Sequence, residues 1–272
     1  MPRALGLAVV FANAIGPETG GSPNADNTHT LWVIVLIIAL IVLIGVEGLL
    51  LYTVIRFRAK KHRAAAQIHG NTRLEIGWTV GAGMIVVALT VVAFVSLPGI
   101  QDPAKSGPEV SLAGAQVASI NPPHVPGGRQ LDIAVNGQQY VWRYTYPDGT
   151  YSYTEMVVPA DQTVVLRITG QDVAHSWWIP KLGPKFDAIP GYINHSWFKI
   201  PASAIPKGKT GVTFRGQCTE LCGYGHANMV AFVRAVPPDR YEQWVARQKR
   251  EIDQANADAV KQRSQFNPIP SQ

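Results

Sequence analysis

The sequence predicts a membrane protein in which a two-helix transmembrane hairpin precedes an all-β domain outside the membrane. Two long apolar stretches in the first hundred residues predict the hairpin, and short β-rich runs separated by turn residues predict the β domain. Charged residues make up only 15% of the 272 residues, against roughly 25% in a typical soluble protein. The two cysteines exclude a small disulfide-stapled scaffold, and the apolar content excludes a disordered or collagen-like chain.

The two predicted membrane spans are residues 31–55 and residues 76–101. A helix of roughly 20 apolar residues crosses the hydrocarbon core of a bilayer. Both stretches exceed that length, which disfavours two buried helices of a soluble core. The second span carries no charge, whereas the first carries Glu47. An acid inside a membrane is a functional candidate; the alternative is a carboxyl group that is protonated or hydrogen-bonded against a neighbouring helix.

The loop between the spans predicts their orientation. Residues 56–73 contain six Lys and Arg and no Asp or Glu, so this loop alone accounts for the net charge of +6. Loops rich in Lys and Arg stay on the cytoplasmic side of a membrane. We therefore expect both termini and the β domain on the outer side of a bacterial cytoplasmic membrane. The excess of positive charge reflects this topology and does not indicate a nucleic-acid-binding protein.

Shifts in composition divide the chain into five expected segments. Residues 1–30 form an outer N-terminal segment, whose first fourteen residues resemble a short signal peptide; an uncleaved outer tail is the alternative. The hairpin covers residues 31–98, and a linker rich in Pro, Gly, Ser and Ala covers residues 99–128. The β domain covers residues 129–237. A C-terminal helix and tail cover residues 238–272.

The β domain is predicted from runs of β-branched and aromatic residues with turn residues between them. Several short strands at this spacing are typical of a sandwich or a Greek-key barrel. The expected strands are residues 131–135, 140–146, 163–168, 195–200, 212–215 and 229–236.

Four potential metal ligands lie within twelve residues of the chain. They are Cys218, Cys222, His226 and Met229, in a Gly-rich loop between the last two expected strands. A further histidine, His175, lies on an earlier strand or loop. Two thiolates, two imidazoles and a thioether are soft or borderline ligands, which suit copper better than calcium or magnesium. The residue types therefore predict a copper site.

Other interpretations leave part of this ligand set unused. A disulfide between the two cysteines is possible in an oxidising compartment, but it gives the histidines and Met229 no role. A tetrahedral zinc site uses two Cys and two His and again omits Met229. A mononuclear blue-copper site needs a single cysteine. Two thiolates can instead bridge two copper ions, each with one His, and such a site favours electron transfer because it leaves no open position for a substrate.

Four motifs give the chain a resemblance to a known family. They are Leu-Glu-Ile-Gly-Trp-Thr at 74–79, Asp-Val-Ala-His-Ser-Trp at 172–177, Lys-Phe-Asp-Ala-Ile-Pro-Gly at 185–191 and Gly-Gln-Cys-Thr-Glu-Leu-Cys at 216–222. With His226 and Met229, these motifs resemble subunit II of the haem–copper cytochrome c oxidases, from the first span to about Trp244. The resemblance implies a cupredoxin-like Greek-key sandwich on the membrane hairpin.

The resemblance also implies an activity and a cofactor. Such a subunit accepts electrons from cytochrome c and passes them to haem in subunit I, where oxygen is reduced and protons are translocated. The enzyme is cytochrome-c oxidase, and its partners here would be subunit I, other oxidase subunits, a c-type donor and the membrane. The cofactor implied is the binuclear copper A centre. Its ligands would be His175, Cys218, Glu220, Cys222, His226 and Met229.

Three acids have roles that the resemblance implies. Glu220 would offer its backbone carbonyl to copper and its carboxylate to a magnesium ion shared with subunit I, and a carboxylate suits magnesium; a surface acid is the alternative. Glu75 would lie at the mouth of a proton pathway, or else be a helix-start carboxylate favoured by the helix dipole. Asp187 would belong to a polar network near subunit I, with a turn-capping role as the alternative.

The chain departs from the family at the expected site of electron uptake. Tyr140 stands where the family has the Trp that receives the electron, and Trp142 follows two residues later. Both rings are candidates for electron uptake, with simple packing as the alternative. The net charge of the β domain also departs from the family, because residues 127–236 hold ten Lys and Arg against seven Asp and Glu. Long-range attraction of a basic donor needs the opposite sign, so we expect a c-type donor that is not strongly basic.

Three other functions are compatible with part of the sequence. A quinol oxidase subunit II has the same architecture without copper, and the complete ligand set argues against it. A membrane-tethered copper chaperone would not need two spans, Glu75 or Glu220. Nitrous oxide reductase shares the copper A centre but needs a much larger catalytic domain than this chain of 272 residues provides.

Overall fold

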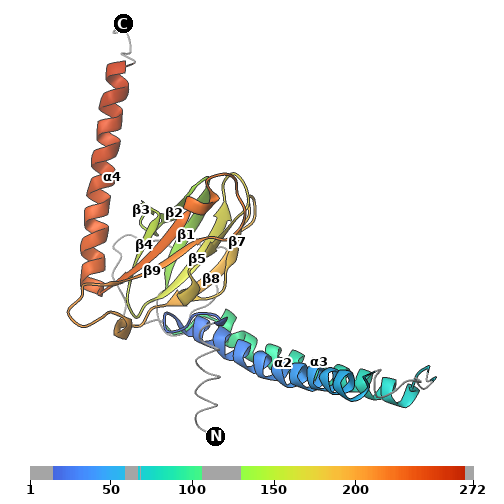
Figure 1. Ribbon diagram of the computed structural model, residues 1–272. Helices are drawn as coiled ribbons and strands as arrows, with labels where there is room; N and C mark the ends of the chain where they lie inside the picture. The colour runs from blue at the N-terminus through green and yellow to red at the C-terminus, as the bar shows by residue number, and fades with distance from the viewer. Residues whose placement is uncertain (1–14, 59–66, 68, 106–129, 267–272) are drawn as a thin grey trace. The chain divides into compact units, whose positions relative to one another are not determined.

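The computed structural model describes residues 15–58, 67, 69–105 and 130–266 (Figure 1). The expected signal peptide, most of the basic loop with Lys60, Lys61 and Arg63, and most of the expected linker lie outside these residues. The described chain forms two compact units. One contains the helical hairpin up to Pro98, and the other contains residues 17–26 together with the chain from Gly99 onward.

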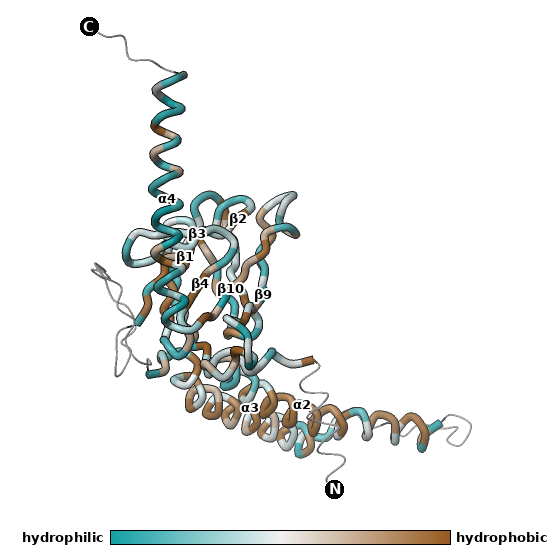
Figure 2. The backbone as a smooth tube through the Cα atoms, turned by 90° about the vertical axis from the view of Figure 1, so that its left-hand side faces the viewer, coloured by the Kyte–Doolittle hydropathy of each residue, from teal (hydrophilic) through white to brown (hydrophobic). Residues whose placement is uncertain are grey.

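The hairpin consists of helix α2 (Pro23–Arg56) and helix α3 (Thr72–Gln101). Both are long and apolar enough to cross a membrane, and Figure 2 shows the brown of apolar residues along both. Their apolar side chains are largely exposed in the single chain, because a lipid-facing helix gains by presenting apolar groups outward. Helix α2 begins eight residues before the predicted span, since Ser22 accepts the N–H groups of Ala25 and Asp26 and starts the helix among polar residues.

The β unit is a sandwich of two five-stranded sheets (Figure 1). The first sheet has the order β3 (Tyr151–Tyr153), β2 (Val141–Thr145), β1 (Leu131–Gln138), β5 (Thr163–Gly170) and β8 (Asn194–Lys199). The second has the order β4 (Glu155–Pro159), β10 (Val230–Val236), β9 (Val212–Cys218), β6 (His175–Trp178) and β7 (Phe186–Ala188).

The chain passes between the sheets rather than completing one before the other. Strands β1 and β5 are parallel neighbours in the first sheet, and β4 and β10 are parallel neighbours in the second. The remaining strand pairs are antiparallel. Mixed pairing of this kind brings β6, β9 and β10 together in one sheet although β6 and β9 are more than thirty residues apart. The predicted sandwich is therefore confirmed.

All six predicted strands form, and four further strands were not predicted. These four strands are β3, β4, β6 and β7, each three to five residues long. Strand β6 is buried at its first three positions, and β4 at its last four. Neither alternates between buried and exposed side chains, so the period of two that identifies a half-buried strand is absent from the sequence.

The core lies between the two sheets. Alternate positions of β9 point inward and bury Phe214, Gly216 and Cys218, as the pleat of a strand requires. Trp142 and Tyr144 of β2 are fully buried on the opposite side. Burial of a large apolar side chain stabilises a fold by roughly 1.5–3 kcal/mol. Cys218, one of the expected copper ligands, is thus part of the core and is held by the same packing that stabilises the sandwich.

Helix α4 (Pro238–Phe266) follows the last strand. Its first turns contribute Tyr241 and Trp244, whose rings lie 6.4 and 5.1 Å from the ring of Tyr146. The hydroxyl of Tyr146 accepts the N–H of Val157 and donates to its carbonyl, at 2.8 and 3.0 Å. The aromatic cluster anchors the start of α4, and most of the helix beyond it is exposed and polar (Figure 2).

Residues 17–26, which include the first residues of α2, belong to the β unit and attach to β8, an edge strand of the first sheet. The side-chain amide of Asn24 donates to the carbonyl of Trp197 at 2.7 Å, and the hydroxyl of Ser22 accepts the N–H of Lys199 at 3.1 Å. The end of α3 meets the same strand, because the indole of Trp197 donates to the carbonyl of Ile100 at 3.0 Å. The edge of the first sheet is therefore covered.

Candidate metal centre

The expected copper ligands lie around the loop that joins β9 to β10. Cys218 ends β9, and Met229 directly precedes β10. The N–H of Cys218 donates to the carbonyl of Met229 at 2.9 Å, so the first and last ligands of the loop face each other across the strand pair. The loop is also tied to β6, because the N–H of Thr219 donates to the carbonyl of Ser176 at 3.0 Å.

The loop and β6 bring five soft or borderline donor atoms together. The Sγ atoms of Cys218 and Cys222 are 3.9 Å apart. His175 Nδ1 lies 3.9 Å from the first sulfur, and His226 Nδ1 lies 3.6 Å from the second. Met229 Sδ is 3.9 Å from Cys222 Sγ. Each thiol therefore has its own imidazole nearby, which is the arrangement expected of a site with two metal ions.

These spacings suit a shared metal ion. Two donors at roughly 2.0–2.3 Å from a tetrahedral ion are separated by about 3.5 Å, close to the distances between the donor atoms here. They do not suit a disulfide, in which the sulfurs are about 2.05 Å apart, and both Cys218 and Cys222 are free thiols. His175, Cys218 and Cys222 form a buried group whose ligand atoms all lie within 4.8 Å of one another.

Burial changes the acidity of the second thiol. Cys222 is 5% exposed, and its burial, followed by the nearby Cys218, raises its pKa to about 11. A thiol with this pKa stays protonated at neutral pH in the metal-free chain. Metals bind the thiolate, so a metal ion that binds here displaces a proton.

A carboxylate contacts the ring nitrogen of His175 that points away from Cys218. His175 Nε2 lies 2.8 Å from Asp172 Oδ1. An ionised carboxylate only accepts hydrogen bonds, so Nε2 carries the hydrogen and the lone pair of Nδ1 faces Cys218. Burial alone would raise the pKa of Asp172, but hydrogen bonds from His175 and from the N–H groups of Gln139 and Val173 outweigh it and lower that pKa. This partner was not predicted, although it stands three residues before His175 in the quoted motif.

Two neighbours of His175 fix the plane of its ring. A Cβ atom on Gly137 would lie 2.9 Å from His175 Cδ2, so glycine is required at this close approach. The indole of Trp142 meets the imidazole edge to face, with ring centroids 5.9 Å apart. Trp142 is fully buried and has no surface through which a partner could touch it.

Tyr140 is arranged differently from Trp142. It is half-buried. Its ring lies against Gly225 in the loop between β9 and β10 (residues 219–229, called the ligand loop below), where a Cβ atom would come within 2.5 Å of the ring. The ring of Tyr224 meets it edge to face at 5.2 Å, and Tyr224 itself is 98% exposed. Of the two aromatic candidates for electron uptake, Tyr140 is the one at the surface.

The three acids lie in different surroundings. Glu220 has an exposed side chain, and its carbonyl oxygen lies 3.3 Å from Cys218 Sγ. Asp187 is also exposed, on β7 opposite Ser176, and its carbonyl accepts the side-chain amide of Asn194 at 2.6 Å. Glu75 belongs to the helical unit. Its carboxylate accepts the N–H of Asn71 at 3.1 Å at the start of α3, which is a capping contact.

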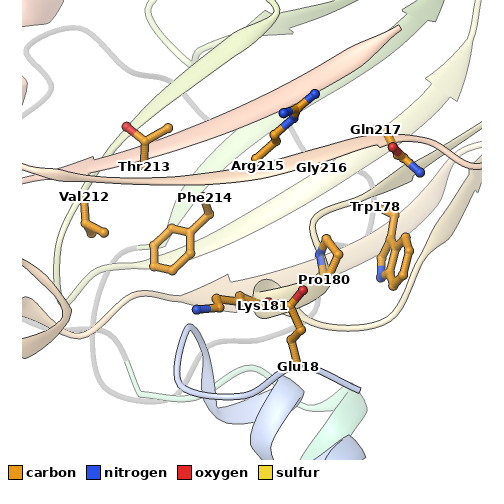
Figure 3. A pocket seen from close by; sticks show the side chains of 10 residues that line it. All are labelled: Glu18, Trp178, Pro180, Lys181, Val212, Thr213, Phe214, Arg215, Gly216 and Gln217. Carbon is orange, nitrogen blue, oxygen red and sulfur yellow. The ribbon is translucent and has the colours of Figure 1, made fainter. Parts of the chain in front are cut away.

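A pocket of about 490 Å³ lies elsewhere on the second sheet. Figure 3 shows Phe214 and Arg215 of β9 on one side of it, with Lys181 and Glu18 on the other. The ten residues that line the pocket include none of the expected metal ligands. The pocket is therefore separate from the group formed by Cys218, Cys222 and Met229, and its lining offers a metal no sulfur or imidazole ligand.

Comparisons with known proteins match both the helical hairpin and the β unit. A family model described as "Cytochrome C oxidase subunit II, periplasmic domain" matches residues 151–236, and one described as the transmembrane domain of the same subunit matches residues 12–98. Cytochrome c oxidase subunit 2 of Cereibacter sphaeroides is 30% identical over 269 residues, covering 85% of this chain and 78% of the relative. The subunit 2 of Alkalihalophilus pseudofirmus is 28% identical, covering 91% and 68%.

Solved structures were found as well. The periplasmic domain of subunit II of cytochrome oxidase from Bradyrhizobium japonicum is 36% identical, covering 44% of this chain and 94% of that chain with a TM-score of 0.40. The two family models and the Cereibacter relative, which this chain covers over more than three quarters of its length, establish the kinship. The chain belongs to the cytochrome c oxidase subunit II family, as a membrane-bound subunit of a haem–copper oxidase.

Proposed function

We propose that this chain is the electron-accepting subunit of the oxidase, with a binuclear copper A centre on its β unit. The observation that carries the proposal is the pair of buried thiols 3.9 Å apart, each with its own imidazole within 3.9 Å. When bound, the copper pair takes up and releases one electron at a time. The ligands would be His175, Cys218, Glu220, Cys222, His226 and Met229.

The donor set supports copper over zinc. A structural zinc ion is satisfied by four ligands of the Cys and His type, which would leave Met229 without a function. Met229 is 1% exposed, and its sulfur lies 3.9 Å from Cys222 Sγ. A weak thioether ligand is typical of copper electron-transfer sites. The carbonyl of Glu220 near the other thiol supplies a second weak donor.

The surroundings of the ligands support electron transfer rather than catalysis. His175, Cys218 and Met229 lie at strand ends and are at most 2% exposed. Ligands held by packed strands move little when the charge of a bound metal changes, and their burial excludes water. A site of this kind exchanges electrons with little rearrangement, and it gives a substrate no access to the metal.

Electrons would reach the site through the exposed face of the ligand loop. Leu221 and Tyr224 are 84% and 98% exposed, and exposed apolar side chains beside a metal site favour contact with a partner protein. Tyr140 connects this face to the loop between Cys222 and His226, with Trp142 behind it against His175. We propose Tyr140 as the first group that the donor meets.

The donor itself would be a c-type cytochrome that is not strongly basic, because the β unit has a surplus of positive charge. Attraction between opposite charges weakens as salt screens it. Turnover with a strongly basic cytochrome c should therefore not fall as ionic strength rises, because there is no net attraction for salt to screen. A steep fall with rising salt would contradict this part of the proposal.

The remaining partners of the site follow from the family. Electrons would pass to haem in subunit I, where oxygen reduction is coupled to proton translocation. The exposed carboxylate of Glu220 would bind a magnesium ion shared with subunit I, and Asp187 would join the polar network there. Glu75 would stand at the mouth of a proton pathway on the cytoplasmic side. The β unit and both termini would face the outer side of a bacterial cytoplasmic membrane.

Copper reconstitution of the full-length chain in detergent tests the centre. We expect an electron paramagnetic resonance spectrum in which one unpaired electron is shared equally by two copper nuclei. Cys218→Ser should abolish that sharing, because a hydroxyl does not replace a bridging thiolate. A spectrum from a single copper ion in the unsubstituted chain, or no copper uptake at all, would overturn the proposal.

A further inference from the structure

We infer that Gln139 and Asp172 form a hydrogen-bonded clamp that positions one histidine and one cysteine ligand before any metal binds. The inference rests on the proposed copper function and extends it to two positioning residues. Neither side chain offers an atom to the metal. Each acts through a ligand, and together they connect the turn between β1 and β2 to both parts of the site.

The clamp has two arms that meet at Gln139. The backbone N–H of Gln139 donates to Asp172 Oδ2 at 2.7 Å, and Asp172 Oδ1 faces Nε2 of His175 at 2.8 Å. The side-chain amide of Gln139 donates to the carbonyl of Cys222 at 2.6 Å. One residue outside the ligand set therefore holds both a histidine ligand and the backbone of a cysteine ligand.

The contacts that form the clamp are specific. Gln139 is 33 residues from Asp172 and 83 from Cys222 along the chain, so only the folded sandwich brings them together. Asp172 Oδ1 also accepts the N–H of Val173 at 2.7 Å, which fixes its carboxylate. Gly223, with a φ of +128°, leaves room for the arm, because a Cβ atom there would lie 3.0 Å from Gln139 Nε2.

The two arms have different chemical consequences. The carboxylate holds the hydrogen of His175 on Nε2 and makes the imidazole a stronger electron donor through Nδ1. A stronger donor stabilises oxidised copper, which lowers the reduction potential. The amide of Gln139 carries no charge and binds a carbonyl that is not a metal ligand. It fixes the position of Cys222 without altering the donor strength of the thiolate.

Substitutions of the full-length chain separate the arms. Gln139→Ala removes the side-chain arm and keeps the backbone arm, while Gln139→Glu keeps the shape but has no amide hydrogen to donate. Asp172→Asn removes the charge from the other arm. The matched control is Gln138→Ala, which breaks the neighbouring bond from Gln138 to Gln171 at 2.7 Å, also across 33 residues.

The copper-loaded chain gives two measurements. Loss of copper to excess EDTA should be about tenfold faster in all three clamp variants, since partners of metal ligands typically contribute tenfold or more to metal affinity. The reduction potential should rise in Asp172→Asn and stay unchanged in Gln139→Ala, whereas the added negative charge of Gln139→Glu should lower it. Gln138→Ala should match the unsubstituted chain in both. Copper loss at the unsubstituted rate in the folded Gln139 variants would overturn the clamp, as would an equal acceleration in Gln138→Ala.

The metal-free chain gives a third measurement, which does not depend on copper. Nitrogen-15 resonances of labelled histidine should show His175 with its hydrogen on Nε2, and a mixture of tautomers in Asp172→Asn, because an amide can donate as well as accept. An unchanged tautomer in that variant would refute the carboxylate arm. If the unsubstituted chain lacked the binuclear copper spectrum but showed this tautomer shift, the proposed function would fail and the positioning of His175 would stand.

Discussion

The ligand loop and the membrane hairpin differ in how far the chain itself covers their side chains. Around the metal site, Cys218, His175 and Met229 are buried inside the chain, and their neighbours hydrogen-bond to one another. Along α2 and α3 the large apolar side chains are mostly exposed, with Val87 at 64% and Phe94 at 70%. The proposed copper ligands all come from one chain, whereas the hairpin needs lipid or other subunits to cover it. Binding of copper and insertion into the membrane should therefore be separable by mutation.

A charge placed in the hairpin should separate membrane insertion from copper binding most clearly. Val87→Lys puts a charge near the middle of α3, at a cost to membrane insertion of about 3 kcal/mol. The fraction of chain that resists alkaline extraction from membranes should fall steeply. The same protein, solubilised in detergent, should keep its copper spectrum. Loss of that spectrum would show that the site depends on the hairpin, and Val87→Leu is the matched control.

A methyl group in the ligand loop should have the reverse effect. Gly225→Ala places a Cβ atom within 2.5 Å of the ring of Tyr140, and forcing volume into packed structure typically costs about 1–3 kcal/mol. Thermal unfolding of the β unit should begin at a lower temperature, while membrane insertion stays normal. The double variant Gly225→Ala with Tyr140→Ala should recover part of the loss. Additive losses would contradict the contact.

The pH dependence of copper binding can be compared with the pH dependence of folding stability. The pKa of Cys222 is raised from 9.0 to about 11 in the folded chain, so binding must displace its proton at neutral pH. Apparent copper affinity should rise with pH below that value, by up to about tenfold per unit for each proton displaced. Without copper, the raised pKa favours the folded state fully below pH 9 and progressively less toward pH 11. Copper titrations and denaturant unfolding at several pH values measure the two effects, and a pH-independent copper affinity would contradict the first.

The smallest effect on stability is expected at Glu75. Glu75→Gln keeps a side-chain oxygen that can accept the N–H of Asn71, as capping glutamines do, so the helix and the copper spectrum should not change. A role in the proton pathway predicts a fall in oxygen consumption by the assembled oxidase, since a glutamine cannot carry a proton. Oxygen consumption at the unsubstituted rate in this variant would show that Glu75 only caps the helix and has no role in proton uptake.

Sequence reasoning reached the hairpin and the sandwich because both have local patterns. Uninterrupted apolar stretches identify the spans, and the spacing of Cys218, Cys222 and His226 draws attention to one loop. It missed four strands, of which β4 and β6 lack alternation. It left open whether His175, which β6 carries, lies on a strand or a loop. It also passed over Gln139, whose contacts with Asp172 and Cys222 cross 33 and 83 residues. Contacts at such separations are fixed by sheet order, which no local pattern encodes.

The attachment of the hairpin ends to β8 has a mechanical consequence. Ser22 just before α2, Asn24 in its first turn and Ile100 at the end of α3 all bond to Trp197 or Lys199 of β8. The proposed metal ligands lie in and beside the second sheet. A pull on either helix end would therefore load the first sheet at β8, and β5 lies between this strand and β1, after which the clamp residue Gln139 follows. The load would enter the sandwich at the sheet that carries none of the proposed ligands.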